Sequence, residues 1–192
     1  MPIAANAQEQ GEIGNEWLRG PKLRLAQNAA PPAAAKPAPA APSLPNGATS
    51  INETYGDWTV SCSITDGQKI CVTTQSQGNS QTGQRTFAVE LRVPKDGKTE
   101  GVLLMPFGLK LDDGVKLKID DQNLGQGARF STCFAQGCLV PVSFPTIATD
   151  AMMKGKSLIV TASNVNGGEP PVFTVPLDGF TAALKRIVEL GG

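Results

Sequence analysis

The stretch YGDWTVSCSITDGQKICVTTQ, residues 55–75, decides how this chain is expected to fold. Every second residue from Trp58 to Cys62 is apolar, which is the pattern of a strand with one buried face. Asp66-Gly67 then predicts a tight turn, and a second strand is expected over Ile70–Gln77. The two strands form a predicted hairpin that Cys71 closes by pairing with Cys62.

The same short alternating pattern continues downstream. VLLMPF, Val102–Phe107, is nearly all apolar and predicts a strand buried on both sides. Leu109–Asp120 predicts a hairpin with a three-residue loop at Asp112–Gly114, a register that places its leucines on one face. Further strands are expected over Phe87–Val93, Ala128–Thr132, Leu139–Ser143, Ser157–Ser163 and Val172–Pro176.

Two short helices interrupt these strands. The first is predicted between Pro145 and Lys154, because proline favours a helix start and Gly155 follows the lysine. The second is GFTAALKRIVEL at the C-terminal end, and its apolar stripe is expected to pack on the sheets. That predicted stripe consists of Phe180, Ala183, Leu184, Ile187 and Val188. The expected fold is therefore mainly β, a β-sandwich of short antiparallel strands with two short helices, one of them C-terminal.

The composition divides the chain into three regions. Residues 1–27 are interpreted as a disordered or processed segment, although EWLRGPKLRLAQ also allows membrane association through this region. Residues 28–52 are rich in alanine and proline and predict a semi-rigid linker. Residues 53–192 are expected to form the β-sandwich domain.

Charge and residue usage exclude several functions. The formal net charge is +0 and both signs are interspersed, which argues against a nucleic-acid partner. No run of apolar residues is long enough to span a bilayer. The chain has no histidine, so Ser-His-Asp and Cys-His catalysis are not available. We predict no catalytic residues, no metal and no cofactor.

The four cysteines predict two disulfides and hence an oxidising compartment. Three pairings are open, and we favour the local ones, Cys62–Cys71 and Cys133–Cys138, because each closes a short loop that contains a turn. A redox centre at Cys133 and Cys138 is the main alternative, but their x4 spacing departs from the Cys-x-x-Cys of thioredoxin-like sites. A structural role is the preferred interpretation.

Four motifs in order resemble the invasion-associated locus B family of bacterial envelope proteins. They are YGDWTVSC with Cys71 and Gln75, MPFGLKLDDGVKLKIDD, CFAQGC and PLDGFTAALKRI, and they span about residues 53–188. The resemblance implies an exported protein with a β-rich fold, and some members of the family are linked to host-cell invasion. The matching residues are interpreted as structural: Trp58, the four cysteines, Gly108, Gly137, Gly179 and Phe180.

The family has no accepted enzymatic activity, so we expect a non-enzymatic protein that binds an envelope or host protein. We expect it to be periplasmic, extracellular or associated with the outer envelope. A clear signal peptide would be expected for the family, and residues 1–17 lack its apolar run, so export is inferred from the cysteines, the linker and the resemblance. The alternatives are a periplasmic thiol–disulfide oxidoreductase and a small-ligand carrier. The sequence does not indicate an oligomeric state.

Overall fold

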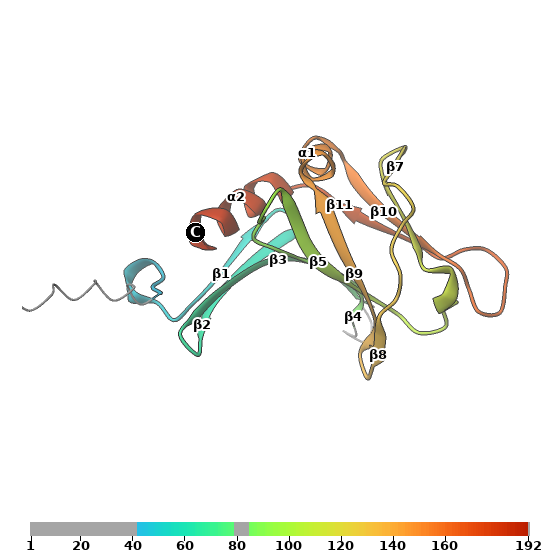
Figure 1. Ribbon diagram of the computed structural model, residues 1–192, viewed down its shortest axis with the longest axis horizontal. Coiled ribbons are helices and arrows are strands. Elements are labelled where there is room, and N and C mark those ends of the chain that lie inside the picture. Colours follow the sequence, from blue (N-terminus) through green and yellow to red (C-terminus); the bar gives the residue numbers. More distant parts are fainter. Residues whose placement is uncertain (1–41, 79–84, 192) are drawn as a thin grey trace, which may run out of the picture. The chain divides into compact units, whose positions relative to one another are not determined.

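The computed structural model describes residues 42–78 and 85–191, which all belong to a compact unit, Ala40–Gly192. Within these ranges the chain forms two antiparallel sheets with two α-helices, as the sequence predicts (Figure 1). The predicted segment 1–27 lies outside the described residues. Residues 28–41 of the predicted linker, 28–52, also lie outside the described residues. In the described part, Leu44 is buried and the first strand begins at Ser50, before the predicted end of the linker.

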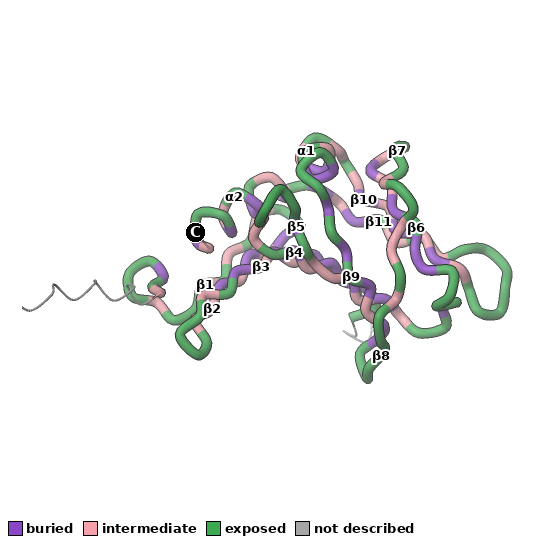
Figure 2. Tube along the Cα trace, viewed as in Figure 1, coloured by how far each residue is buried: buried purple, intermediate pink, exposed green. Residues whose placement is uncertain are grey.

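The larger sheet has seven strands among the described residues, in the order β1-β2-β3-β4-β5-β9-β8. Alternate side chains face inward, so that burial changes from residue to residue along the strands (Figure 2). Trp58 and Phe87 are fully buried on this inward face. The strands are β1 (Ser50–Tyr55), β2 (Trp58–Thr65), β3 (Gln68–Gly78), β4 (Arg85–Arg92), β5 (Lys98–Met105), β9 (Gly137–Pro145) and β8 (Thr132–Phe134).

The smaller sheet has the order β11-β10-β6-β7, and its edge strand β11 meets the larger sheet. Trp58 Nε1–H donates to the carbonyl oxygen of Pro176 at 3.0 Å, and Gln77 Nε2–H donates to that of Thr174 at 2.6 Å. Side chains of the larger sheet thus bind carbonyl oxygens of the edge strand β11, which protects that edge from pairing with a further strand. The strands are β6 (Val115–Ile119), β7 (Gln122–Asn123), β10 (Ser157–Ala162) and β11 (Val172–Pro176).

Both helices have their predicted positions. The helix α1 (Thr146–Lys154) packs on β9 and β5, and α2 (Phe180–Gly191) packs on β2 and β3. Two short 3-10 turns, η1 (Pro45–Gly47) and η2 (Leu111–Asp113), complete the described elements. Neither helix has the length and hydrophobicity that crossing a bilayer requires, within the part of the chain that the structure describes.

One predicted member of the helix stripe is wrong. Val188 is 45% exposed, and Leu190 is buried in its place. At about 100° per residue, Leu190 lies about 60° from Ile187 around the helix, whereas Val188 lies about 100° on the other side, at the edge of the buried stripe. The solvent boundary of α2 therefore falls between Leu184 and Val188.

The predicted hairpin over Leu109–Asp120 is also wrong. Leu109 instead forms an isolated bridge with Asn164, and Val115–Ile119 pairs with β10. Asp112 lies in η2 rather than in a hairpin loop, so the chain passes from the larger sheet to the smaller one at this point. The chain does turn at Asp112–Gly114, as predicted. The strand that follows, β6, however pairs with β10, which lies about 45 residues further along the sequence.

A salt bridge fastens α2 to the edge strand β1. Arg186 donates to both carboxylate oxygens of Glu53, at 2.7 and 2.8 Å, and Tyr55 Oη–H donates to the same carboxylate at 2.8 Å. The hydrogen bond from Arg186, followed by that from Tyr55, lowers the pKa of Glu53. The Glu53 carboxylate in turn raises the pKa of Arg186, so the pair stays charged at neutral pH.

Candidate functional site

Trp58 and Phe180 lie in the interior and not on a binding face. Neither is exposed, and their ring centroids are 4.8 Å apart in a tilted arrangement. Gly179, with a φ of +81°, brings the backbone before Phe180 against the carbonyl group of Tyr55, where a Cβ would not fit. These residues therefore set how α2 joins the sheet.

The disulfides are Cys62–Cys71 and Cys133–Cys138, which confirms the predicted local pairing. In each case the two cysteines lie directly opposite one another across a hairpin. The described part of the chain holds no free cysteine. Gly137, next to Cys138, lies so close to the carbonyl oxygen of Met105 that a Cβ would not fit.

The candidate site lies where the loops after β5, β8 and β10 meet. We call it the loop-end surface and define it by four exposed apolar side chains, which are Phe107 (61% exposed), Leu111 (43%), Phe134 (43%) and Val165 (59%). They are half of the large apolar side chains that are exposed within the described ranges. Large exposed apolar groups on neighbouring segments are typical of interaction sites.

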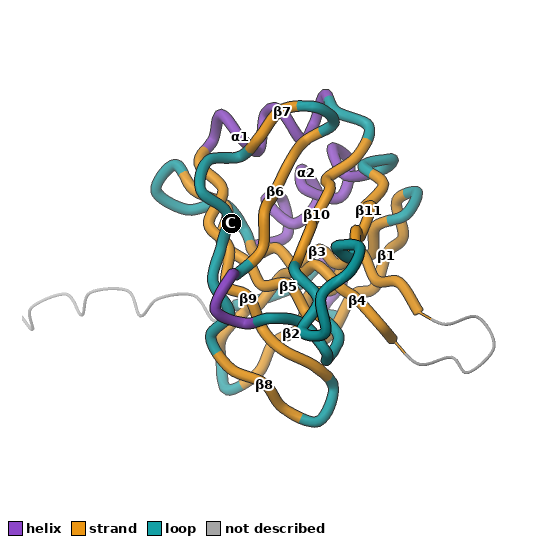
Figure 3. Tube along the Cα trace, turned by 90° about the vertical axis from the view of Figure 1, so that its right-hand side faces the viewer, coloured by secondary structure: helices purple, strands orange, loops and turns teal. Residues whose placement is uncertain are grey.

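Backbone contacts hold these segments together. Val165 N–H donates to the carbonyl oxygen of Gly108 at 3.0 Å, and Lys110 N–H donates to that of Ser163 at 2.9 Å. On the other side, Leu111 and Cys133 line one groove of about 220 Å³. The segment that follows β5 is therefore fixed between the β10–β11 loop and the β8–β9 hairpin (Figure 3).

The sequence did not predict this surface. VLLMPF was interpreted as a strand buried on both faces, but Val102 and Leu104 are only partly buried, and β5 ends at Met105. Pro106 follows directly, and Phe107 is exposed. The signal that could have found the site is the Pro-Phe-Gly sequence, because proline and glycine on both sides of an aromatic residue indicate a loop. Gly108, predicted to be structural, lies in this loop.

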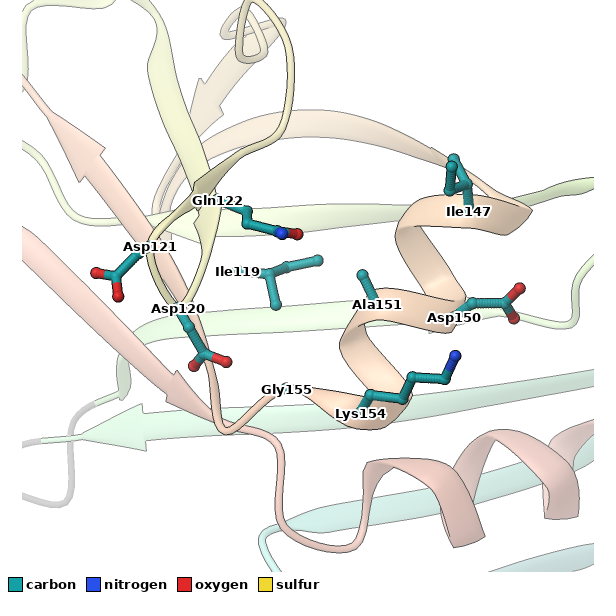
Figure 4. A pocket seen from close by; sticks show the side chains of 9 residues that line it. All are labelled: Ile119, Asp120, Asp121, Gln122, Ile147, Asp150, Ala151, Lys154 and Gly155. Carbon is teal, nitrogen blue, oxygen red and sulfur yellow. The ribbon is translucent and has the colours of Figure 1, made fainter.

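A second hollow lies between the β6–β7 turn and α1, with a volume of about 650 Å³ (Figure 4). Ile119 and Ala151 face each other across it, and Gln122 points across it towards α1, while Asp121 points away. Asp120 is already bound, because its carboxylate accepts the backbone N–H groups of Lys156 and Ser157 at 3.0–3.2 Å.

These contacts make Asp120 a turn residue, as turn chemistry predicts. The bond from the Lys156 N–H is the main cause that lowers the pKa of Asp120. Among residues 42–78 and 85–191, no group of three carboxylate or cysteine side chains is placed to hold a metal ion. The hollow therefore offers an apolar floor with a polar rim but no defined chemical centre.

The fold and the surface define a disulfide-containing β-sandwich with half of its exposed large apolar side chains, among the described residues, on the loop-end surface. The model of the family described as invasion associated locus B (IalB) protein matches residues 58–188. The chain belongs to this family, as the resemblance of its motifs implied.

Three individual proteins illustrate the relationship. The chain is 49% identical over 150 residues to an invasion protein B homolog of Brucella abortus (strain 2308), covering 78% of this chain and 86% of the relative. It is 37% identical over 168 residues to invasion protein B of Bartonella bacilliformis, covering 86% and 88%. The crystal structure of invasion associated protein B from Bartonella henselae superimposes with a TM-score of 0.67 at 30% identity, covering 73% of this chain and 96% of that one.

Proposed function

We propose that this protein is a non-enzymatic, exported bacterial envelope protein that binds an envelope or host component through the loop-end surface. The observation that carries the proposal is the exposure of Phe107, Leu111, Phe134 and Val165 on segments that the two sheets connect. Backbone hydrogen bonds hold the segments that carry Phe107 and Val165, so their backbone loses little conformational freedom on binding, which favours affinity.

Two features support the exported state. Both disulfides are formed, and disulfides persist in oxidising compartments such as the periplasm or the cell exterior. The relatives are named invasion proteins, and we extend this link with invasion to the present chain as part of the proposal.

The test uses the full chain in intact cell envelopes. A chemical cross-linker is applied to the wild type and to Phe107→Ser/Phe134→Ser, which makes two of the four exposed groups polar. We expect the wild type to give a defined adduct with one partner and the variant to lose about nine-tenths of it, because interface energy is concentrated in a few aromatic residues.

The matched control is Ile70→Ser/Val188→Ser. Both residues are exposed to a similar degree, at 50% and 45%, but lie in β3 and α2. The control should retain the adduct. Loss of the adduct in the control alone, or in both variants with unchanged thermal stability, would contradict the assignment of the loop-end surface.

A further inference from the structure

The two disulfides share one topology but differ in burial. Cys62 and Cys71 are both buried, at 2% and 4% exposure, between the interior strands β2 and β3. Cys138 is also buried, at 2%, whereas Cys133 is exposed on the edge strand β8. Thiolates attack a disulfide sulfur that they can reach, so the second disulfide presents one reactive side, which is Cys133.

The surroundings of Cys133 suit a small thiol. Its groove of about 220 Å³ is also lined by Arg129, Ser131 and Phe130. Arg129 and Asp112 both line this groove, so that it carries one charge of each sign beside Cys133. Cationic neighbours favour thiolates over thiols, and Arg129 is the cationic residue of the groove. The rest of the lining is mixed, with hydroxyl groups from Ser131 and Thr132 and apolar side chains from Phe130 and Leu111.

The disulfide also holds β8 in place. Among the described strands, β8 pairs with β9 alone, over Thr132–Phe134, and all three of its residues are exposed. The strand β9 is held independently, because it pairs with β5 from Cys138 to Pro145. Loss of the disulfide would therefore leave β9 in the sheet and β8 attached by a few backbone hydrogen bonds, such as Ser131 N–H to Leu139 O at 2.8 Å.

We propose that Cys133–Cys138 is a thiol-reducible catch that holds the loop-end surface together, with Cys133 as the sulfur that a small thiol such as glutathione attacks. The inference rests on the proposed function, since the surface it controls is the proposed binding site. Phe134 belongs to β8, so release of this strand would move Phe134 away from the loop-end surface. Leu111 lines the same groove as Cys133, so it would become more exposed to solvent.

The reaction balances as thiol–disulfide exchange. One thiolate attacks Cys133 Sγ, the Cys133–Cys138 bond breaks, and Cys138 leaves as a thiolate that takes up a proton. A second thiolate attacks the small thiol's sulfur in the mixed disulfide and releases Cys133. Two thiols are oxidised to one small disulfide, and the protein disulfide is reduced to two cysteine thiols.

The chemical test treats the native full-length chain with increasing glutathione, blocks free thiols by alkylation and locates the modified cysteines by mass spectrometry. We expect Cys133–Cys138 to open at least about tenfold faster than Cys62–Cys71, which serves as the internal control. Glutathione should be found on Cys133 and not on Cys138 when the reaction is stopped before the second thiol attacks. Equal opening of both disulfides, or glutathione on Cys138, would overturn the catch.

The structural readout is amide hydrogen exchange of the oxidised and the glutathione-treated wild type. Exchange over 130–136 should rise about tenfold on reduction, while 139–145 should be unchanged, because only β8 loses its attachment. Unchanged exchange over 130–136 would overturn the catch even if the sulfur chemistry is selective.

Partner capture then separates the two proposals. Oxidised wild type should capture its cross-linked partner, and the Cys133→Ser/Cys138→Ser variant should capture much less. Selective opening of the disulfide without any partner for the oxidised protein would overturn the proposed function and leave the catch standing. Full capture by the reduced protein would overturn the catch and leave the proposed function.

Discussion

Gly179→Ala should lower the free energy of unfolding by much more than the unfavourable backbone conformation of an alanine at this position would by itself. Gly179 has a φ of +81°, and a Cβ there would collide with the Tyr55 carbonyl and would lie 2.8 Å from Gly56 N, where ordinary contact begins at 3.4 Å. Gly67→Ala is the matched control, because Gly67 has a φ of +71° with nothing within 4 Å of its Cβ position. The unfavourable φ therefore lowers the free energy of unfolding of both variants by about 1 kcal/mol.

The collision adds further terms at Gly179 alone. The turn must move away from Tyr55, which breaks the hydrogen bond from Asp57 N–H to Asp178 O and loosens the contact between Trp58 and Phe180. Each of these losses is worth about 1 kcal/mol. The expected destabilisation is thus about 3 kcal/mol for Gly179→Ala against about 1 kcal/mol for Gly67→Ala.

The assay is urea unfolding of the oxidised protein, followed by tryptophan fluorescence and far-UV circular dichroism. In thermal unfolding followed by the same two signals, a domain of this size should show a melting temperature lowered by about 6–12 °C in Gly179→Ala and by about 3 °C in the control. If the two variants agree within about 0.5 kcal/mol at equal m-values, the close packing of Gly179 on Tyr55 does not determine the docking of α2.

Three further predictions concern the core and its edge. Trp58→Ala should lower the free energy of unfolding by about 3–5 kcal/mol in urea titrations, since the ring is fully buried; a loss under about 1 kcal/mol would contradict its central position. Leu190→Ser should cost about 2 kcal/mol and Val188→Ser less than about 0.5, measured in the same way, and the reverse order would contradict the orientation of α2. The folded-state pKa of Glu53 is lowered, so its stabilisation is complete above the unfolded value of 4.5 and is lost as the pH falls through the folded value. Glu53→Gln should therefore lower the melting temperature at pH 7 and have a smaller effect near pH 3, and a pH-independent difference would contradict the ion pair.

The elements with regular periodicity were predictable. The alternation after Trp58, the turn at Asp66-Gly67 and the strand Val172–Pro176 all appear in the structure close to their predicted bounds. Both disulfides follow from the same local information, because each closes the hairpin that its own flanking residues predict.

Pairing between distant segments was not predictable in the same way. The leucines of Leu109–Leu117 fit a local hairpin, yet β6 gains more by pairing with β10, which lies in the other half of the domain. The candidate site depends on similar long-range contacts, since the Val165 N–H donates to the carbonyl oxygen of Gly108, a residue far away in the sequence. A single sequence shows that the residues of the loop-end surface are apolar but not that they remain exposed.

The most direct measurement is site-specific photo-cross-linking in intact cell envelopes, with one photoreactive residue placed in turn at Phe107, Phe134, Val165, Ile70 and Val188. All five positions are exposed, so each should carry the probe without loss of stability. The account predicts one adduct of constant mass from the first three positions and none from Ile70 or Val188. Adducts from Ile70 or Val188, with none from the loop-end surface, would show that the protein binds its partner through another face.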